Sequence, residues 1–402
     1  MKKQILTLIL LVVCVTLSAC QRETVNKADR EPTAVRYSWM AGESPVPERR
    51  MGLVRQGLII VPYAISPTGV YFVEQGGDSK GNFILYGDHG SDTLIRLCGR
   101  ADCYHNDEDC NAYLFRASAL SYYNGYLYGV SGSGSEETCT LVRMHPDSSG
   151  HETLLDLLAF AREQGGDYIQ GEMISDGILA FDVYQWVEYD DGDPTTVAAH
   201  GTFCQSYYYR LDGSMSHPEV AGYTEKWMLL HDIPTGFCAW TPESKTGTEN
   251  GSYWNWDPDT NTCTYLTDHP GQPGWFDEKQ AYYHLDGAIR RRDNATGTDT
   301  VMVETGLEGE YYLTAFSDCI VLTSRSEDHN KDMIYIYNWG FELVSAIKLE
   351  YPHRWYSEFL LIGETAERLI LTDTYGGNPL YYIEKSELGT GNAQIHEFQY
   401  FR

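Results

Sequence analysis

The chain has 402 residues, and its 57 acidic residues outnumber its 29 Lys and Arg, which gives a formal net charge of -28. A chain this negative repels the phosphates of nucleic acids, so we exclude a function that depends on binding DNA or RNA. A length of 402 residues is typical of two or three ordinary domains, although an all-β ring of repeats can reach this length as one unit.

A short export signal opens the chain. The basic start Met1-Lys2-Lys3 precedes an apolar run, Ile5–Leu17, which is too short to span a bilayer as a helix. The run ends in Leu17-Ser18-Ala19-Cys20, which resembles the lipobox of bacterial lipoproteins. The resemblance implies that residues 1–19 are a removed signal peptide and that Cys20 receives a lipid anchor. The alternative is an ordinary secretory signal with an incidental cysteine.

The expected location follows from this signal. Two acyl chains on one cysteine hold a protein durably on a membrane, and no later segment approaches the ~20 consecutive apolar residues of a membrane-spanning helix. We therefore expect attachment by lipid to the extracytoplasmic face of the cell membrane. Residues 20–50 mix charges with prolines, which predicts a flexible tether, and residues 51–402 then form a single folded domain.

One short pattern recurs through the expected domain. A turn residue is followed by three or four apolar residues, and successive copies lie 38 to 59 residues apart. A mean step of about 50 residues is in the length range of a four-stranded propeller blade. The seven copies begin at Gly69, Gly125, Gly177, Gly236, Gln280, Asp318 and Arg368.

A second apolar run ending in a polar turn follows most copies, as in Tyr207–Leu211 before Asp212-Gly213. Two strands, a hairpin turn and a further strand are the internal order of a blade. We therefore predict an all-β fold, a β-propeller of seven blades, with six or eight as alternatives because the steps are uneven. Two stacked β-sandwich domains are the alternative architecture. Leu53–Tyr63 is the segment expected to close the ring with the last blade.

One segment has a helical pattern instead. His151–Gln164 carries Leu154, Leu155, Leu157 and Leu158, a dense apolar face at helical spacing. We expect an inserted helix here, packed over the edge of a blade.

The most specific constellation consists of Cys98, Cys103, His105 and Cys110, within thirteen residues. Thiolates and an imidazole suit a tetrahedral ion such as Zn²⁺, and four protein ligands are typical of a structural zinc site. In an oxidising compartment, two of the cysteines could instead form a disulfide, with the third paired elsewhere or free. The spacing leaves both alternatives open, and either would fasten the outer edge of the first blade.

The same block resembles a family of uncharacterised lipoproteins from gut Firmicutes. The sequence LCGRADCYHNDEDCNAY, from Leu97 to Tyr113, is similar to a Leu-Cys, Cys-x-His, Cys-Asn-Ala signature in those proteins. The resemblance covers the leader, this block and the style of the repeats. It implies a lipid anchor and a propeller, and it implies no activity.

The remaining motifs do not assemble a catalytic centre. Gly77–Gly81 matches the G-x-S-x-G pattern of a nucleophile elbow, but that elbow lies between a strand and a helix, and strands are expected on both sides here. Paired carboxylates are abundant, and one sequence with 57 acids does not select the facing pair that glycoside hydrolysis requires.

The aromatic residues favour binding. Most of the tryptophans lie beside turns, and rings at the face of a propeller stack on sugars or hold peptide side chains, although filling the space between blades is their commoner role. We therefore expect a binding or scaffolding module for a glycan, a peptide or a cell-surface partner protein. The alternative is an extracellular hydrolase or lyase with its site at the propeller centre.

Overall fold

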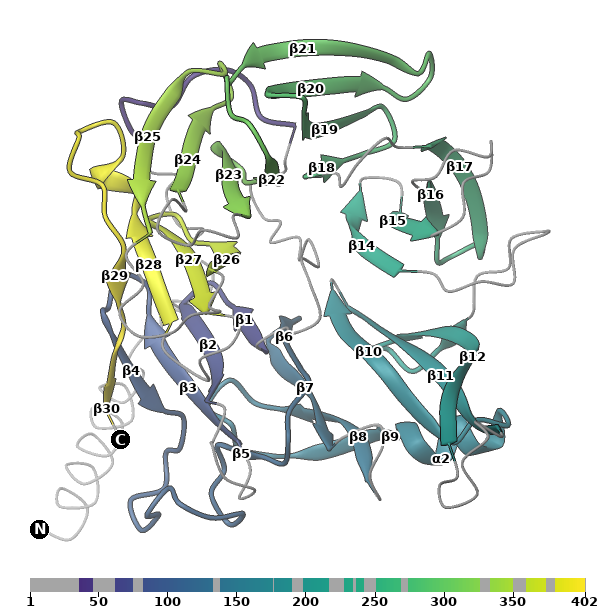
Figure 1. Cartoon of the computed structure of the whole chain (residues 1–402). Coiled ribbons are helices and arrows are strands. Elements are labelled where there is room, and N and C mark those ends of the chain that lie inside the picture. Colours follow the sequence, from purple (N-terminus) through teal and green to yellow (C-terminus); the bar gives the residue numbers. More distant parts are fainter. Residues whose placement is uncertain are drawn as a thin grey trace, which may run out of the picture. The chain divides into compact units, whose positions relative to one another are not determined.

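In the computed structural model of the protein, the described strands form seven sheets that follow one another along the chain, and all strand pairs are antiparallel except that of β30 with β4 (Figure 1). Consecutive strands pair within each sheet, and the first strand of each sheet lies nearest the centre of the view in Figure 1. The structure describes residues 36–45, 62–74, 82–132, 138–175, 177–189, 198–216, 228–233, 236–241, 251–268, 274–325, 333–349, 359–373 and 380–401.

The first three sheets cover the N-terminal half of the described chain. The first sheet contains β1 (Tyr63–Ile65), β2 (Gly69–Glu74), β3 (Asn82–Asp88), β4 (Thr93–Arg96), β5 (Tyr113–Leu114) and β30 (Gln399–Phe401). The second contains β6 (Ala119–Tyr123), β7 (Tyr126–Gly132), β8 (Cys139–Met144) and β9 (Glu152–Asp156). The third contains β10 (Tyr168–Ser175), β11 (Ile178–Tyr189), β12 (Ala198–Arg210) and β13 (Met215–Ser216).

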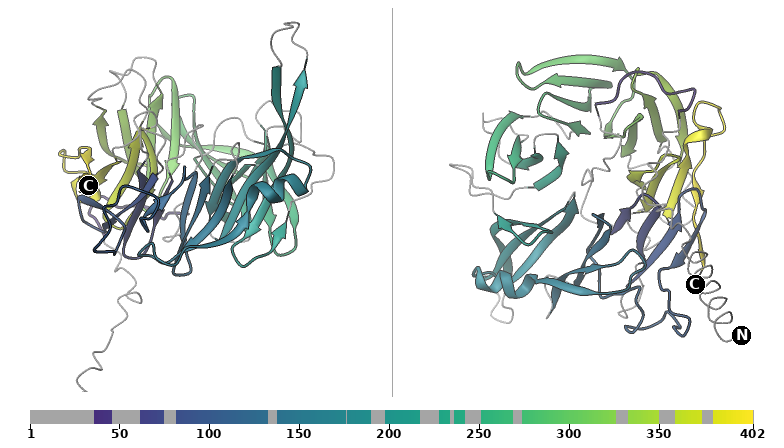
Figure 2. Two further views of the ribbon diagram at one scale, coloured as in Figure 1. Left: turned by 90° about the horizontal axis from the view of Figure 1, so that it is seen from below. Right: turned by 180° about the vertical axis from the view of Figure 1, so that it is seen from behind.

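Four further sheets complete the series. They are β14 (Met228–Ile233), β15 (Gly236–Thr241), β16 (Ser252–Asp257) and β17 (Thr262–Asp268); β18 (Trp275–Phe276), β19 (Gln280–Leu285), β20 (Ala288–Asp293) and β21 (Thr298–Glu304); β22 (Glu310–Ala315), β23 (Cys319–Arg325), β24 (Met333–Asn338) and β25 (Leu343–Lys348); and β26 (Phe359–Glu364), β27 (Arg368–Asp373), β28 (Leu380–Glu384) and β29 (His396–Glu397). The β11–β12 hairpin is the longest, and it projects beyond the neighbouring strands in Figure 2.

The repeats found in the sequence correspond to these sheets. Each of the seven copies begins within one residue of the second strand of a sheet, at β2, β7, β11, β15, β19, β23 and β27. The apolar residues after each turn therefore form the strand that is paired on both sides, which explains why they are uniformly apolar. The predicted all-β propeller architecture is confirmed.

Neighbouring sheets are joined by shared hydrophobic cores. Between the first and second sheets, for example, Val73 packs in one cluster with Leu127. The last sheet shares a cluster with the first, in which Ile370 and Leu380 lie with Phe72. Each successive pair of sheets has such a cluster, so the seven sheets follow one another in a closed cycle.

The described strand that joins the two ends of the cycle comes from the C-terminal side. β30 pairs parallel with β4, with Gln399 opposite Thr93 and Phe401 opposite Ile95. Most of Leu53–Tyr63, the segment predicted to close the ring, lies outside the described part of the chain (residues 53–61), and Tyr63 begins β1, the first strand of the first sheet.

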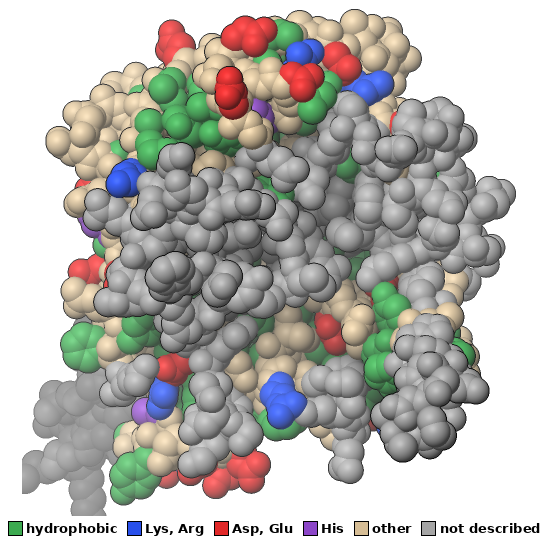
Figure 3. Space-filling model, viewed as in Figure 1, with side chains coloured by type: hydrophobic (Ala, Val, Ile, Leu, Met, Phe, Trp, Pro, Cys, Tyr) green, Lys and Arg blue, Asp and Glu red, His purple; other side chains and the backbone are tan. Residues whose placement is uncertain are grey.

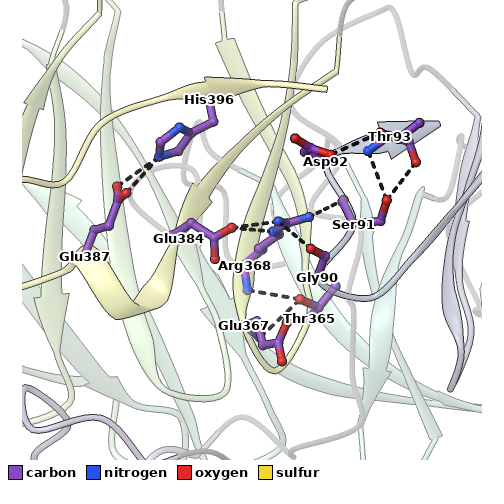
Figure 4. A network of polar contacts seen from close by, with 10 residues as sticks. All are labelled: Gly90, Ser91, Asp92, Thr93, Thr365, Glu367, Arg368, Glu384, Glu387 and His396. Atoms are coloured by element: carbon purple, nitrogen blue, oxygen red, sulfur yellow. Dashed lines mark hydrogen bonds and ion pairs between the residues drawn. The ribbon is translucent and has the colours of Figure 1, made fainter. Parts of the chain in front are cut away.

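Arg368 reinforces this junction (Figure 4). From β27 its guanidinium donates hydrogen bonds to the backbone carbonyls of Gly90 and Ser91, in the turn between β3 and β4. It also forms an ion pair of 2.7 Å with Glu384, and it lies 4.0 Å from the centre of the Tyr382 ring. A side chain of the last sheet thus satisfies backbone groups of the first.

The helix in the structure is shorter than the one predicted over His151–Gln164. Glu152–Asp156 forms β9, which pairs with β8, and only Leu157–Glu163 forms the helix α2. The Asp156 carboxylate caps α2 by accepting a hydrogen bond of 2.9 Å from the Ala159 amide. The segment completes a four-stranded sheet first, so pairing with β8 overrides its helical periodicity.

The N-terminal part of the described chain packs on the sixth and seventh sheets. Trp39 is buried among residues of both sheets, its indole N–H donates to the Lys385 carbonyl at 2.9 Å, and its own carbonyl accepts from the Asn338 amide group at 3.0 Å. These contacts lie within the stretch expected as a tether. The rest of that stretch, apart from residues 36–45, lies outside the described residues, as do the export signal and Cys20. No helix in the described ranges is long and apolar enough to cross a membrane.

Candidate functional site

The loop between β4 and β5 gathers the cysteine and histidine side chains singled out in the sequence. The sulfurs of Cys98, Cys103 and Cys110 and one ring nitrogen of His105 all lie within 4.8 Å of one another. His105 Nδ1 is 3.6 Å from Cys110 Sγ. Folding therefore brings together all four predicted ligands.

The cysteines of this cluster are free thiols, as are the other described cysteines, namely Cys139, Cys204, Cys263 and Cys319. A disulfide within the cluster would use two of the sulfurs and leave His105 without a role. Four ligands around one ion at about 2.3 Å for sulfur and about 2.0 Å for nitrogen would stand a little under 4 Å apart, close to the observed spread. The residues present fit a tetrahedral metal ion.

The backbone of the loop supports the same arrangement. The His105 amide donates a hydrogen bond of 3.4 Å to Cys103 Sγ, and His105 has a positive φ of 55°, a conformation that side chains other than Gly rarely adopt. Amide N–H groups aimed at sulfur stabilise thiolates, the form that binds metal.

The environments of two thiols differ. Burial opposes ionisation of Cys98, yet hydrogen bonds from the backbone of Arg100 and Asn111 outweigh it and lower the Cys98 pKa. Burial raises the pKa of Cys110 to about 12, even though the Ala112 backbone favours its thiolate. Without a metal, Cys98 is thus the readier of the two to ionise.

One arginine ties the loop to the first sheet, and another joins two parts of the loop. Arg96 donates to the His105 carbonyl, pairs with Glu74 at 3.0 Å, and lies 4.5 Å from the centre of the Phe83 ring. Arg100 donates to the Asp109 carbonyl at 2.7 Å. Cys110 itself is only 3% exposed and belongs to the core between the first two sheets. A bound ion would therefore fasten this loop to the interface of two sheets.

A second candidate site lies among the innermost strands of three consecutive sheets. A small hollow of about 10 Å³, room for about one water molecule, opens to solvent here and is lined by residues 62–63, 118–120 and 172–174. These residues belong to or adjoin β1, β6 and β10, of which β6 contacts both β1 and β10 (Figure 1). The sequence had suggested a central site, without indicating which residues would form it.

Two hydroxyl groups in this lining have no hydrogen-bond partner among the described residues. They are the Oη of Tyr63, a residue that is 7% exposed, and the Oγ of Ser118, and both oxygen atoms are buried. Burial raises the Tyr63 pKa far above its ordinary value, so the phenol stays protonated. A buried hydroxyl without a partner is costly, and such groups are often satisfied by a ligand or water.

A β-bulge brings an acid to the same hollow. The pairing of β10 with β11 shifts between Gln170 and Met173, and Gly171 has a φ of 73°. The extra residue bends β10 locally, so Glu172 joins the lining beside Met173 and Ile174. Among the lining residues, Glu172 is the one with a charged side chain.

The described tryptophans mostly have the commoner of the two roles considered for them, which is to fill the space between blades. Trp254, Trp256, Trp275 and Trp339 are all at least nine-tenths buried, and they fill the space within and between sheets. Trp186, in the projecting β11–β12 hairpin, is 49% exposed. Its ring stacks on that of Tyr168 in β10, with ring centres 4.6 Å apart. The described tryptophans are therefore mostly core residues. Gly77–Gly81 lies outside the described residues.

Comparison with solved structures finds similar chains at low sequence identity. An acylaminoacyl peptidase bound to a chloromethyl ketone is similar at a TM-score of 0.51 and 9% identity, over 84% of this chain and 51% of that one. The β-propeller domain of the Trilobed protease from Pyrococcus furiosus has a TM-score of 0.41 at 11% identity, over 68% of this chain and 77% of that one. This chain thus spans about half of the peptidase. Likeness at such low identity concerns the fold alone.

Comparisons by sequence give no family. No family model matches the chain, and no curated protein matches it either.

Proposed function

We propose that this protein is a binding module: a β-propeller attached by lipid to the extracytoplasmic face of the cell membrane, which presents a ligand pocket at its inner strands. The observation that carries the binding function is the hollow beside β1, β6 and β10. It is lined by two buried hydroxyls, on Tyr63 and Ser118, that have no partner among the described residues, and by the Glu172 side chain. A few polar groups in a mostly apolar lining are typical of a site that contacts a ligand.

The surroundings of the pocket favour binding because they hold it in a fixed shape. Its three strands belong to successive sheets that share hydrophobic cores, and the cycle is joined by β30 and Arg368. A preorganised pocket loses little conformational entropy when a ligand binds. The acidic side chains, which form several patches on the face shown in Figure 3, favour positively charged ligands over nucleic acids or anionic lipids.

Zinc is the metal we assign to the cluster of Cys98, Cys103, His105 and Cys110. Three thiolates and one imidazole match the ligand preference of Zn²⁺, and four protein ligands would leave no open position for a substrate. The ion would then act structurally, by holding the β4–β5 loop on the core between the first two sheets.

The anchor is assigned to Cys20 on the evidence of the Leu17–Cys20 motif and the resemblance to lipoproteins. The test is mass spectrometry of the chain purified from a bacterial membrane. A diacylglyceryl modification on Cys20, lost together with membrane attachment in Cys20→Ser, is the expected result. An unmodified cysteine in a fully secreted chain would overturn the anchor and leave the pocket untouched.

The binding function is tested with the full chain on arrays of glycans and peptides. Saturable binding that Tyr63→Phe weakens supports the proposal. The contrary result is turnover of a polymer with no stable binding, which would favour an extracellular hydrolase or lyase.

A further inference from the structure

A buried lysine lies against two acids between the sixth and seventh sheets. Lys385 begins the short 3₁₀ helix η3 (Lys385–Glu387), which follows β28, and its side chain is 1% exposed. Its Nζ lies 2.8 Å from Asp318 Oδ2, in the turn between β22 and β23, and 2.6 Å from Glu364 Oε2, at the end of β26. An amino group is thus held against two carboxyl groups where water has little access.

The surroundings of these groups are apolar. Asp318 lies in the chain between Phe316 and Cys319, and Lys385 lies three residues before Leu388. Phe316, Cys319 and Leu388 all belong to the hydrophobic core of the last two sheets. Burial of a charge is costly, so such an environment favours uncharged groups over ions. Condensation of an ammonium and a carboxylate to an amide and water removes two buried charges.

The two acids are held differently. Both oxygens of Glu364 have partners, since Oε1 accepts a hydrogen bond of 2.6 Å from the Ser317 amide and Oε2 accepts one from Lys385. Asp318 Oδ1 is buried without a hydrogen-bond partner among the described residues. The Asp318 carboxyl carbon lies one C–O bond beyond Oδ2, and hence no more than about 4 Å from Lys385 Nζ. Glu364 is therefore fixed for proton transfer, and Asp318 has an oxygen that can leave.

We propose that Lys385 and Asp318 condense to an isopeptide bond, with Glu364 as the acid–base group. Lys385 Nζ forms a bond to Asp318 Cγ, and the bond from Cγ to one carboxyl oxygen breaks. Glu364 carries two protons in turn from the nitrogen to that oxygen, which departs as water. The ammonium and the carboxylate become a neutral amide, the Glu364 carboxylate is regenerated, and the reaction consumes no oxidant.

The protonation of the two partners of this transfer is consistent with such a reaction. Burial raises the pKa of Glu364, although Lys385 opposes that rise. A carboxyl group with a raised pKa can accept a proton and return it near neutral pH. Burial lowers the Lys385 pKa, but the charges of Glu364 and Asp318 outweigh it and raise that pKa. The neutral amine is therefore the scarce form, and we expect the bond to form slowly after folding.

The bond would join two sheets covalently. Asp318 and Lys385 are 67 positions apart, and they come from the sixth and seventh sheets of the cycle. A cross-link that closes a long loop stabilises a fold chiefly by restricting the unfolded chain. The inference is independent of the proposed binding function, because it concerns a different part of the ring.

The test is mass spectrometry of the full chain, incubated in the folded state, then denatured and digested with trypsin. The expected product is the peptide that contains Asp318 joined to the peptide that contains Lys385, with a mass equal to their sum less one water. Recovery of both peptides only in their unlinked forms would overturn the inference. A peptide linked through Glu364 instead would contradict the choice of Asp318.

Variants separate the reaction from the fold, and the melting temperature of each is measured to show that it is folded. Glu364→Gln keeps Lys385 and Asp318 but loses the carboxylate that carries the protons, so the bond should form about a hundredfold more slowly. Glu163→Gln removes the same charge from an exposed position of α2 and should leave the rate unchanged. Asp318→Ala should give no linked peptide. Linkage at the parental rate in folded Glu364→Gln would contradict the role of Glu364.

Discussion

The Lys385 ammonium lies 2.6 Å from the Glu364 carboxylate, buried between the sixth and seventh sheets. Lys385 is 1% exposed, and a second carboxylate, that of Asp318, stands 2.8 Å from the same nitrogen. Glu364 also accepts a hydrogen bond of 2.6 Å from the Ser317 amide. One buried cation therefore holds two acids that come from different sheets, and the Lys385 carbonyl receives the indole N–H of Trp39.

Replacing Lys385 should lower the stability of the folded protein. Lys385→Met leaves two buried carboxyl groups without a counter-charge, and we expect the free energy of unfolding to fall by about 3–5 kcal/mol. Lys348→Met, at an exposed position of β25, is the matched control and should change it little. Urea denaturation of the three proteins makes the comparison, and equal stability of Lys385→Met and its control would contradict the role.

The same variant should show an altered dependence on pH. Burial raises the Glu364 pKa in the folded protein, and Lys385 acts against that rise. A carboxyl whose pKa is raised by folding contributes stability below its unfolded pKa and loses it as pH rises through the folded value. Removing Lys385 raises the Glu364 pKa further, so the deficit of Lys385→Met should be larger at about pH 7 than at about pH 5. Denaturation at both values tests this, and a constant deficit would contradict it.

Arg368 should matter more than a surface arginine. Arg368→Leu removes the donors that the Gly90 and Ser91 carbonyls accept, and it leaves Glu384 unpaired, so we expect a loss of about 2–3 kcal/mol. Arg210→Leu breaks the exposed pair with Asp259 and should cost less than about 1 kcal/mol. Thermal unfolding of the two variants measures the difference, and equal losses would show that the junction does not depend on Arg368.

If the cluster of Cys98, Cys103, His105 and Cys110 binds zinc, the zinc content of the chain and its melting temperature in a chelator can be predicted. Elemental analysis should find one zinc per chain, and a strong chelator should lower the melting temperature of the parent protein. Cys103→Ser should lose the zinc and melt lower, whereas Cys204→Ser, a free cysteine outside the cluster, should keep it. A chain without zinc in which Cys98, Cys103 and Cys110 are blocked to thiol reagents would instead establish disulfides.

Trp39 tests whether the segment before the first sheet is part of the fold. Its ring stacks on Tyr37 with centres 5.8 Å apart and packs into the core of the last two sheets. We expect Trp39→Ala to lower the free energy of unfolding by about 3–5 kcal/mol. Trp186→Ala, on the exposed hairpin, should have a small effect, and similar stability of the two variants would mean that residues 36–45 act only as a linker.

Much of the fold was predictable because the central strands carry a strong local signal. Strands such as β2 and β27 are paired on both sides and buried, so they need uniformly apolar residues, and a Gly or polar residue marks each turn before them. The metal cluster was predictable for a similar reason, since all its ligands lie within one short loop.

Features that depend on distant residues could not be predicted. The parallel pairing of β30 with β4 joins residues about three hundred positions apart, and nothing local marks either strand. Tyr63, Ser118 and Glu172 form no motif, because each comes from a different sheet. The segment before α2 has a helical pattern, and only its neighbour β8 makes it a strand.

The pairing of β30 with β4 has a consequence for the order of assembly. The first sheet can form most of its antiparallel pairs early, yet the outer edge of β4 gains its partner only after all of the later sheets have been synthesised. Until then that edge exposes unpaired backbone groups to other chains. Synthesis is therefore the stage at which the chain is most exposed to aggregation, and a chain whose C-terminal strand is lost should keep this edge open.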